Sequence, residues 1–311
     1  MQSPDEGRYG VAMRRLPSLA ALALSVTLWS TSPAVAQNPR PPAPHVRTIL
    51  FVGNSFTQGA LSAVRRYRIN SVVDLTGDMQ GGVPALFRLF AEEAGLNYAV
   101  SLETQGGQPL GFHWTQRRQL IDRAWDVVVL QEYSALDPTK PGDPSDLNTY
   151  APLLAAMFAK ANPRVDVQLM ATWSRADLVY RPGSPWSGKP VAAMAAELRR
   201  AADAARLLHP AIRGVVPVGE AWNRAIAAGI ADPNPYDGIA FGKIDLWAWD
   251  HYHASAHGYY LEALVVFGRV TGVDPAILGP GERAAEDLGI APATAVALQR
   301  VARDELAAQK R

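Results

Sequence analysis

The chain reads Ile49-Leu50-Phe51-Val52-Gly53-Asn54-Ser55-Phe56-Thr57 where an apolar run stops at a glycine and a serine follows. The run predicts a buried strand, and the glycine marks a turn towards a helix. A serine at such a turn can lift its hydroxyl from the edge of a sheet and act as a nucleophile. Gly-Asn-Ser after a strand is also common in ordinary turns and helix caps, so the role of Ser55 depends on the rest of the chain.

Further short apolar runs alternate with helical stretches, which predicts a parallel sheet with crossover helices. The clearest is Asp126-Val127-Val128-Val129-Leu130, which is apolar without alternation, as in a strand buried on both faces. We expect strands at about 48–53, 97–103, 126–131, 165–172 and 213–218. We expect helices at about 83–95, 149–162, 189–207, 219–229 and 255–271, and a last helical stretch at about 281–309. The predicted class is α/β with a mostly parallel five-stranded sheet.

Two long connections, 134–148 and 174–189, follow the third and fourth predicted strands. Both leave the carboxyl edge of the sheet, where ligands bind in open α/β folds. Loops of this length in a compact domain commonly have a function. The segment 58–82 gives no assignable pattern.

The first 36 residues predict a secretory signal peptide. Arg14-Arg15 precedes an apolar run, Ala34-Val35-Ala36 fits the small-residue cleavage pattern, and Met13 is a candidate for the true start. We therefore expect export, to the periplasm or to the medium. No later apolar run is long enough to span a membrane. The expected organisation is a signal peptide over 1–36, a Pro-rich linker over 37–47, one domain over 48–275, and a helical extension packed on it over 276–311.

Composition narrows the classes of function. The chain has 30 basic and 29 acidic residues, so it lacks the charge excess of a nucleic-acid-binding protein. It has no cysteine, which excludes disulfides, thiolate metal sites and a cysteine nucleophile. The sequence indicates no cofactor and does not reveal the oligomeric state.

A serine nucleophile needs a base, and His253 is our candidate. Asp250 stands three residues earlier, a spacing at which its carboxylate can hold the second ring nitrogen of the histidine. Attack by Ser55 also requires donors for the developing oxyanion. Gly107, after the second predicted strand, offers a backbone amide, and Gln131, at the end of the third, offers a side-chain amide. A structural role for Gln131 is nearly as well supported.

These residues resemble the SGNH (GDSL-like) hydrolases. Gly53-Asn54-Ser55 is similar to the family's first block, Gly107 to its glycine block, and Asp250-x-x-His253-Ala-Ser to the last block of a poorly characterised branch. The resemblance covers most of 48–275. It implies a three-layer α/β/α flavodoxin-like domain, an oxyanion hole formed by Ser55, Gly107 and a third donor, and hydrolysis of an ester through an acyl-enzyme.

The chain departs from the family in its third block, where an asparagine usually completes the oxyanion hole. It reads Gln131-Glu132 there. Gln131 carries the same amide on a longer arm. Glu132 would repel an oxyanion, so we predict that it turns away or pairs with a cation.

The substrate is suggested only by tryptophans near the predicted site loops. Trp173 and Trp249 are our candidates for substrate contact, because flat aromatic faces suit sugar rings; packing in the core is the competing interpretation. A small-molecule ester or a carbohydrate ester is the expected substrate. The wider set of tryptophans near these loops is Trp114, Trp173, Trp186, Trp247 and Trp249.

Two other functions compete with the serine esterase. One is a metal-dependent hydrolase, since His253 and His257 have the i,i+4 spacing of helical zinc pairs and stand near Asp250 and His251. It lacks the glutamate of the helical H-E-x-x-H motif and leaves Ser55 without a role. The other is a non-catalytic glycan-binding protein on the same fold.

Overall fold

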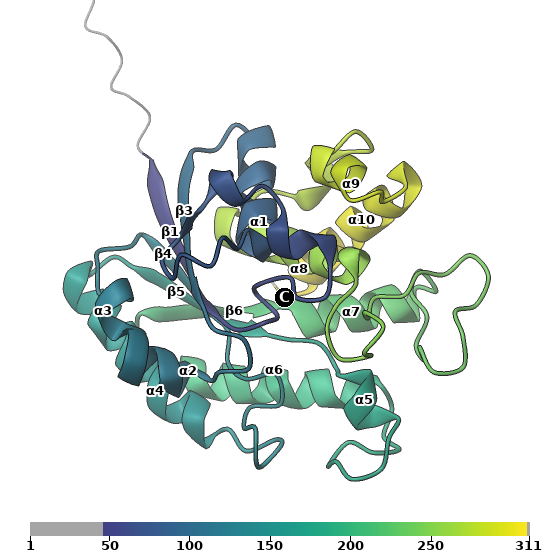
Figure 1. The fold of residues 1–311 in the computed structure, drawn as a ribbon, viewed down its shortest axis with the longest axis horizontal. Coiled ribbons are helices and arrows are strands. Elements are labelled where there is room, and N and C mark those ends of the chain that lie inside the picture. Colours follow the sequence, from purple (N-terminus) through teal and green to yellow (C-terminus); the bar gives the residue numbers. More distant parts are fainter. Residues whose placement is uncertain (1–45, 310–311) are drawn as a thin grey trace, which may run out of the picture. The chain divides into compact units, whose positions relative to one another are not determined.

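A six-stranded sheet forms the centre of the computed structural model, which describes residues 46–309 (Figure 1). The strand order is β2-β3-β1-β4-β5-β6, and every neighbouring pair is parallel. The predicted α/β class is confirmed. The strands are β1 Arg47–Gly53, β2 Val73–Asp74, β3 Tyr98–Thr104, β4 Val127–Leu130, β5 Asp166–Ala171 and β6 Ile212–Pro217.

The signal peptide predicted over 1–36 lies outside the described residues, and so does nearly all of the linker predicted over 37–47. Within residues 46–309, no helix combines the length and the apolar character needed to cross a bilayer.

The prediction of five strands is wrong by one. The sixth strand, β2, is only two residues long and lies inside the segment 58–82, which had no assignment. Val73 and Asp74 pair with Ser101 and Leu102 at the edge of the sheet. Two residues are too few to show an alternating pattern, so the sequence of β2 does not predict a strand. The strand is defined by its pairing with β3. The same segment also holds two short 3₁₀ helices, η1 Ala63–Arg66 and η2 Ile69–Ser71.

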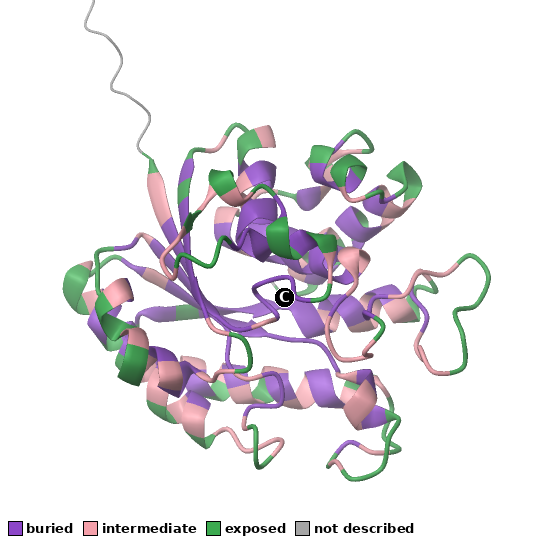
Figure 2. Cartoon of the chain, viewed as in Figure 1, coloured by how far each residue is buried: buried purple, intermediate pink, exposed green. Residues whose placement is uncertain are grey.

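Helices cover both faces of the sheet and give the predicted three layers (Figure 1). Figure 2 shows buried residues along the strands and on the helix faces that meet them. One face carries α4 Ser145–Ala161 and α6 Ala192–Arg206, with the short helices α2 Leu110–Phe112, α3 Arg118–Ile121 and α5 Ala176–Val179 and the π-helical turn η3 His113–Arg117 nearby. The other face carries α1 Gly82–Glu93, α7 Val218–Ala227 and α8 Ala256–Thr271.

The last predicted helical stretch is divided. It forms α9 Arg283–Asp287 and α10 Pro292–Ala308, after a 3₁₀ turn, η4 Pro275–Leu278. Gly289 has φ +70° between them, and Pro292 begins α10, as proline favours at a first helical position. Leu298 and Ala302 of α10 belong to the same apolar core as α1 and α8.

Strand order determines where a ligand would bind. Apart from β2, the order is that of flavodoxin-like sheets, whose direction of winding reverses between β1 and β4. Ser55 follows β1 and Gln131 follows β4. Both therefore lie at the carboxyl edge of the sheet, at the reversal where open α/β proteins bind ligands.

Candidate active site

Ser55 sits in a turn that is packed against the end of the sheet. Strand β1 ends at Gly53, and the amide of Gln58 then donates to the carbonyl of Asn54 at 3.0 Å. A side chain on Gly53 would come within 2.5 Å of Thr57 Oγ1 and 2.7 Å of Gln131 Oε1. Glycine is therefore required by the close approach of these two side chains, and the turn presents Ser55 half-buried at the strand end.

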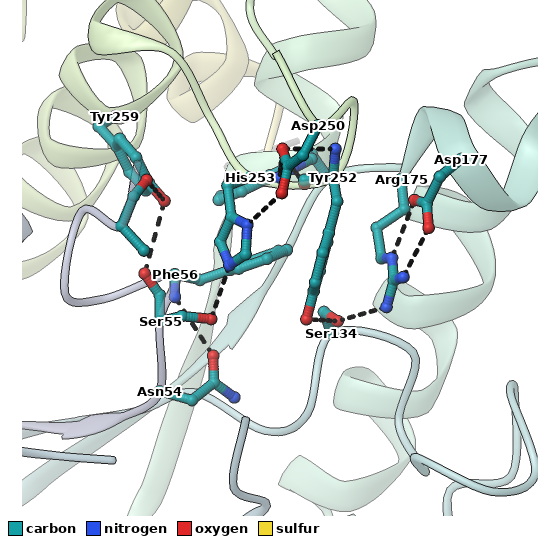
Figure 3. A network of polar contacts seen from close by, with 12 residues as sticks. Asn54, Ser55, Phe56, Ser134, Arg175, Asp177, Asp250, Tyr252, His253 and Tyr259 are labelled. Atoms are coloured by element: carbon teal, nitrogen blue, oxygen red, sulfur yellow. Dashed lines mark hydrogen bonds and ion pairs between the residues drawn. The ribbon is translucent and has the colours of Figure 1, made fainter. Parts of the chain in front are cut away.

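Ser55, His253 and Asp250 form a continuous hydrogen-bonded line (Figure 3). Ser55 Oγ lies 2.9 Å from His253 Nε2, and His253 Nδ1 lies 2.6 Å from Asp250 Oδ2. With the Nδ1 proton donated to the carboxylate, Nε2 is free to accept the serine proton. The structure thus brings together the three residues predicted as nucleophile, base and acid.

The acid–base loop, residues 247–254, is shaped for this pairing. Asp250 Oδ1 accepts the amides of Tyr252 at 3.1 Å and His253 at 3.0 Å, while Oδ2 faces the imidazole. His251 adopts φ +57°, which turns the backbone tightly between the two functional residues. Ser255 then caps α8 by accepting the amide of Gly258 at 3.3 Å, so the helix begins directly after the loop.

Asp250 is held in its charged form. Burial of the carboxyl would raise its pKa, but hydrogen bonds from the His253 ring and from the amides of Tyr252 and His253 outweigh burial. The pKa of Asp250 therefore lies below its ordinary value of 3.8. A carboxylate that stays ionised can orient a neutral imidazole and stabilise the imidazolium that forms when it takes a proton.

The loop after β3, which contains Gly107, is hydrogen-bonded to the turn that carries Ser55. The loop that holds Gly107 is fixed beside the nucleophile at both ends, because the amide of Gln105 donates to Gly53 O at 3.0 Å and Asn54 Nδ2 donates to Gln108 O at 3.1 Å. Gly107 has φ +71° and is exposed. Within residues 46–309, neither the Ser55 amide nor the Gly107 amide donates to a protein acceptor.

The oxyanion role expected for Gln131 is not what the structure shows. Its side chain is fully buried, and Oε1 accepts the Asn54 amide at 2.9 Å and the Thr57 hydroxyl at 3.1 Å. Its Nε2 donates to the carbonyl of Glu132. The amide oxygen thus braces the loop that carries Ser55, and the amide nitrogen is bonded within the loop after β4. The physical reason for this arrangement is that Gly53 has no side chain, so Gln131 can pack directly against the backbone of the turn.

Glu132 turns away from the site, as predicted. Its Oε1 accepts the amides of Leu110 at 3.1 Å and Tyr133 at 2.6 Å. Burial raises the pKa of its carboxyl to about 8, although these two hydrogen bonds act in the opposite direction. Glu132 therefore fastens the start of α2 to the loop after β4 and presents no charge to an oxyanion.

The two tryptophans predicted to contact substrate differ in their surroundings. Trp173 is fully buried between Phe56, at 4.0 Å between ring centroids, and Trp222, at 4.6 Å, so the prediction for Trp173 is wrong. Stacking on rings distant in sequence places it in the core. Trp249, next to Asp250, is 76% exposed and open to a ligand. Trp186 and Trp247 are buried, and Trp114 is partly buried.

The metal site considered above does not form. Among residues 46–309, no group of three or more histidine, aspartate or glutamate side chains is placed to hold a metal ion. His251 packs against Tyr236, with ring centroids 4.2 Å apart, while the ring of His253 lies between Ser55 and Asp250. His257 lies in the first turn of α8.

Two residues that support the nucleophile were missed from the sequence. Asn54 ties three segments together, since Nδ2 reaches Gln108 O at 3.1 Å and Glu132 O at 3.4 Å while Oδ1 accepts the Phe56 amide at 3.3 Å. The Tyr259 hydroxyl of α8 donates to Ala60 O at 3.1 Å. An asparagine directly before the nucleophile was a usable signal, because its amide can join loops. The sequence around Tyr259, within an apolar helix, gave no signal of this role.

Comparison with known proteins supports the fold. No family model and no curated protein matches the sequence. Among solved structures, a DUF4886 family protein from Bacteroides uniformis aligns at a TM-score of 0.57 and 17% identity, over 86% of this chain and 97% of its own. A GDSL-like lipase from Parabacteroides merdae aligns at 0.50 and 18% identity, over 74% of this chain and 99% of its own. The chain therefore shares its fold with these two structures, one of which is described as GDSL-like, in agreement with the fold that the motifs implied.

Proposed function

We propose that the protein is a serine hydrolase that acts on ester bonds, with Ser55, His253 and Asp250 as its catalytic triad. The observation that carries the proposal is the line of two hydrogen bonds, 2.9 Å and 2.6 Å long, that joins these side chains at the carboxyl edge of the sheet. The fold shared with a GDSL-like lipase supports it.

In the proposed reaction, Ser55 Oγ attacks the ester carbonyl carbon while its proton passes to His253 Nε2. The carbonyl π electrons move to oxygen and give a tetrahedral oxyanion. When this intermediate collapses, the bond to the alcohol oxygen breaks and His253 gives its proton to the leaving alcohol. Water then attacks the acyl-enzyme with His253 again as base, which releases the acid and restores Ser55.

Backbone donors stabilise the oxyanion in this proposal. The amides of Ser55 and Gly107 have no protein acceptor within residues 46–309, which supports their assignment as the two donors. Preorganised donors of this kind act at the charge that develops in the transition state. Gln131 is left out of the hole because its amide is used within the loop.

We also propose that the substrate is a small-molecule or carbohydrate ester and that the enzyme works after export. Trp249 supports the first part, since its exposed ring adjoins Asp250 in the sequence and offers a flat face for a sugar ring. The Arg14-Arg15 and Ala34-Val35-Ala36 pattern supports the second. Cell fractionation of the full chain and of a variant without residues 2–36 tests export, which fails if both remain in the cytoplasm.

The central experiment combines covalent labelling with turnover. Purified protein is treated with a fluorophosphonate probe and, separately, with a short acyl ester, in wild type and in Ser55→Ala and His253→Ala. Wild type should label and hydrolyse, and both variants should lose activity. Ser71→Ala is the matched control. Ser71 is exposed, and its hydroxyl donates to the carbonyl of Arg68 and not to a residue of the triad. The proposal fails if wild type neither labels nor turns over, or if Ser55→Ala remains active.

A further inference from the structure

The segment Trp173–Asp177, which follows β5, holds the backbone of the acid–base loop. Trp173 Nε1 donates to Tyr252 O at 3.2 Å, and the Asp177 amide donates to His251 O at 3.2 Å. In the opposite direction, Trp247 Nε1 donates to Ser174 O at 2.9 Å. Three hydrogen bonds thus fasten the loop that carries both Asp250 and His253 to one short segment.

The same segment supports the two aromatic rings that contact the His253 ring. The Tyr252 ring lies against the imidazole at 4.1 Å between centroids, and Phe56 meets it edge-on at 5.7 Å. Behind Phe56, Trp173 stacks at 4.0 Å with an interplanar angle of 4°. Behind Tyr252, the guanidinium carbon of Arg175 lies 3.6 Å from the ring centroid. Figure 3 shows Tyr252 standing between His253 and Arg175.

The guanidinium of Arg175 is itself held in place. Nε and one terminal nitrogen donate to the two carboxylate oxygens of Asp177 at 3.1 Å and 2.7 Å, and the other terminal nitrogen donates to Ser134 Oγ at 3.3 Å. Ser134 Oγ in turn donates to the Tyr252 hydroxyl at 3.3 Å. A bidentate carboxylate fixes the plane of the fork and balances its charge. The flat face of Arg175 is therefore presented to Tyr252 in one orientation.

We propose that Arg175 is a positioning residue for His253, acting through the ring of Tyr252. This role rests on the proposed hydrolase function, in which the imidazole must keep one orientation while it takes and returns a proton. A planar, charge-balanced guanidinium is suited to hold an aromatic ring flat, whereas a lysine ammonium has neither the plane nor the fork. Among residues 46–309, the side chain of Arg175 donates hydrogen bonds to Asp177 and Ser134 and none to Ser55.

The test compares Arg175→Met, which removes the charge and the fork but keeps the stem, with Arg175→Lys, which keeps the charge and the stem but loses the planar fork. Arg47→Met is the matched control, because Arg47 also packs on a tyrosine, Tyr98, but at the amino-terminal end of β1. Three quantities are measured: kcat and KM for a short acyl ester, thermal unfolding, and the downfield proton resonance of the His253–Asp250 hydrogen bond. His253→Ala assigns that resonance.

We expect both Arg175 variants to lower kcat about tenfold or more while KM stays within about twofold, because small misplacements of a catalytic group act on the chemical step. The downfield resonance should shift or broaden in both, and Arg47→Met should leave kcat and the resonance unchanged. Wild-type kcat and an unchanged resonance in folded Arg175→Met overturn the proposal. Full activity in Arg175→Lys also overturns it, since charge alone would then suffice.

The resonance separates this proposal from the proposed function. If wild type hydrolyses no ester, the hydrolase proposal fails, and the resonance still reports whether Arg175 orients the imidazole. A resonance that is unchanged in both folded variants then overturns the positioning role. If Arg175→Met does not fold, Arg175→Lys carries the same comparison, because it retains the charge and most of the side-chain volume.

Discussion

The amide of Asn54 donates to Gln131 Oε1 at 2.9 Å, so the residue expected at the third position of the oxyanion hole instead braces the nucleophile loop. Thr57 donates to the same oxygen at 3.1 Å, and both bonds are buried. Gln131 thereby connects the end of β4 to the turn after β1. The position of Ser55 depends on a side chain that does not face the site.

Removing this brace should lower the free energy of unfolding clearly and reduce kcat only moderately. Gln131→Ala leaves the buried Asn54 amide without an acceptor, so we expect the free energy of unfolding to fall by about 1–3 kcal/mol. The loss in kcat should stay below the roughly 100- to 1,000-fold loss that follows removal of an oxyanion donor. Urea denaturation and ester hydrolysis measure the two effects.

Gln299→Ala is the control for that variant, because Gln299 is also buried and donates to Tyr260 and Gly279, away from the triad. It should lose comparable stability and keep kcat. If the Gln131→Ala protein has wild-type stability and a 100-fold lower kcat, Gln131 acts as an oxyanion donor and the bracing role is wrong.

A methyl group at Gly53 should disturb the nucleophile directly. The added carbon would lie 2.5 Å from Thr57 Oγ1, in the same turn, and 2.7 Å from Oε1 of the buried Gln131 side chain. We expect Gly53→Ala to lower the free energy of unfolding by about 1–3 kcal/mol and to reduce fluorophosphonate labelling of Ser55. Gly281→Ala serves as the control, since nothing lies within 4 Å of its added carbon. Equal labelling of the two variants would show that the turn tolerates the extra atom.

Sequence reasoning succeeded where the signal was local. The uninterrupted apolar run Val127–Leu130 predicted β4, and Asp250 and His253 are joined by a short loop whose geometry follows from their spacing. It failed where packing between segments distant in the sequence determines the surroundings of a side chain. Gln131 was assigned from its place in a motif, but its burial follows from Gly53. The stacking of Arg175 on Tyr252 joins loops that only the folded sheet brings together.

The sequence also did not distinguish the buried Trp173 from the exposed Trp249, and this difference gives a paired prediction. Trp173→Ala removes a ring stacked between Phe56 and Trp222 and should lower the free energy of unfolding by about 3–5 kcal/mol. Trp249 is 76% exposed, so Trp249→Ala should change stability by less than about 0.5 kcal/mol. Any effect of Trp249→Ala should appear in KM. Thermal unfolding and a KM series check the pair, and equal destabilisation of both variants would contradict it.

The buried carboxyl of Glu132 should make stability depend on pH. Burial raises its pKa from 4.5 to about 8 in the folded protein, so between these values the folded chain keeps a proton that the unfolded chain has lost. Because the unfolded state binds fewer protons in this window, the contribution of Glu132 is fully present below pH 4.5 and is lost as pH rises through about 8. The slope is at most about 1.4 kcal/mol per pH unit.

Glu132→Gln tests this dependence, because the amide resembles the protonated carboxyl and can still accept the Leu110 and Tyr133 amides. Relative to Glu132→Gln, wild type should lose stability steadily in urea unfolding between pH 5 and pH 8. The exposed Glu286 provides the control, since the difference between wild type and Glu286→Gln should stay constant over the same range. A constant difference for Glu132→Gln as well would mean that the Glu132 carboxyl is already ionised in the folded protein at pH 5.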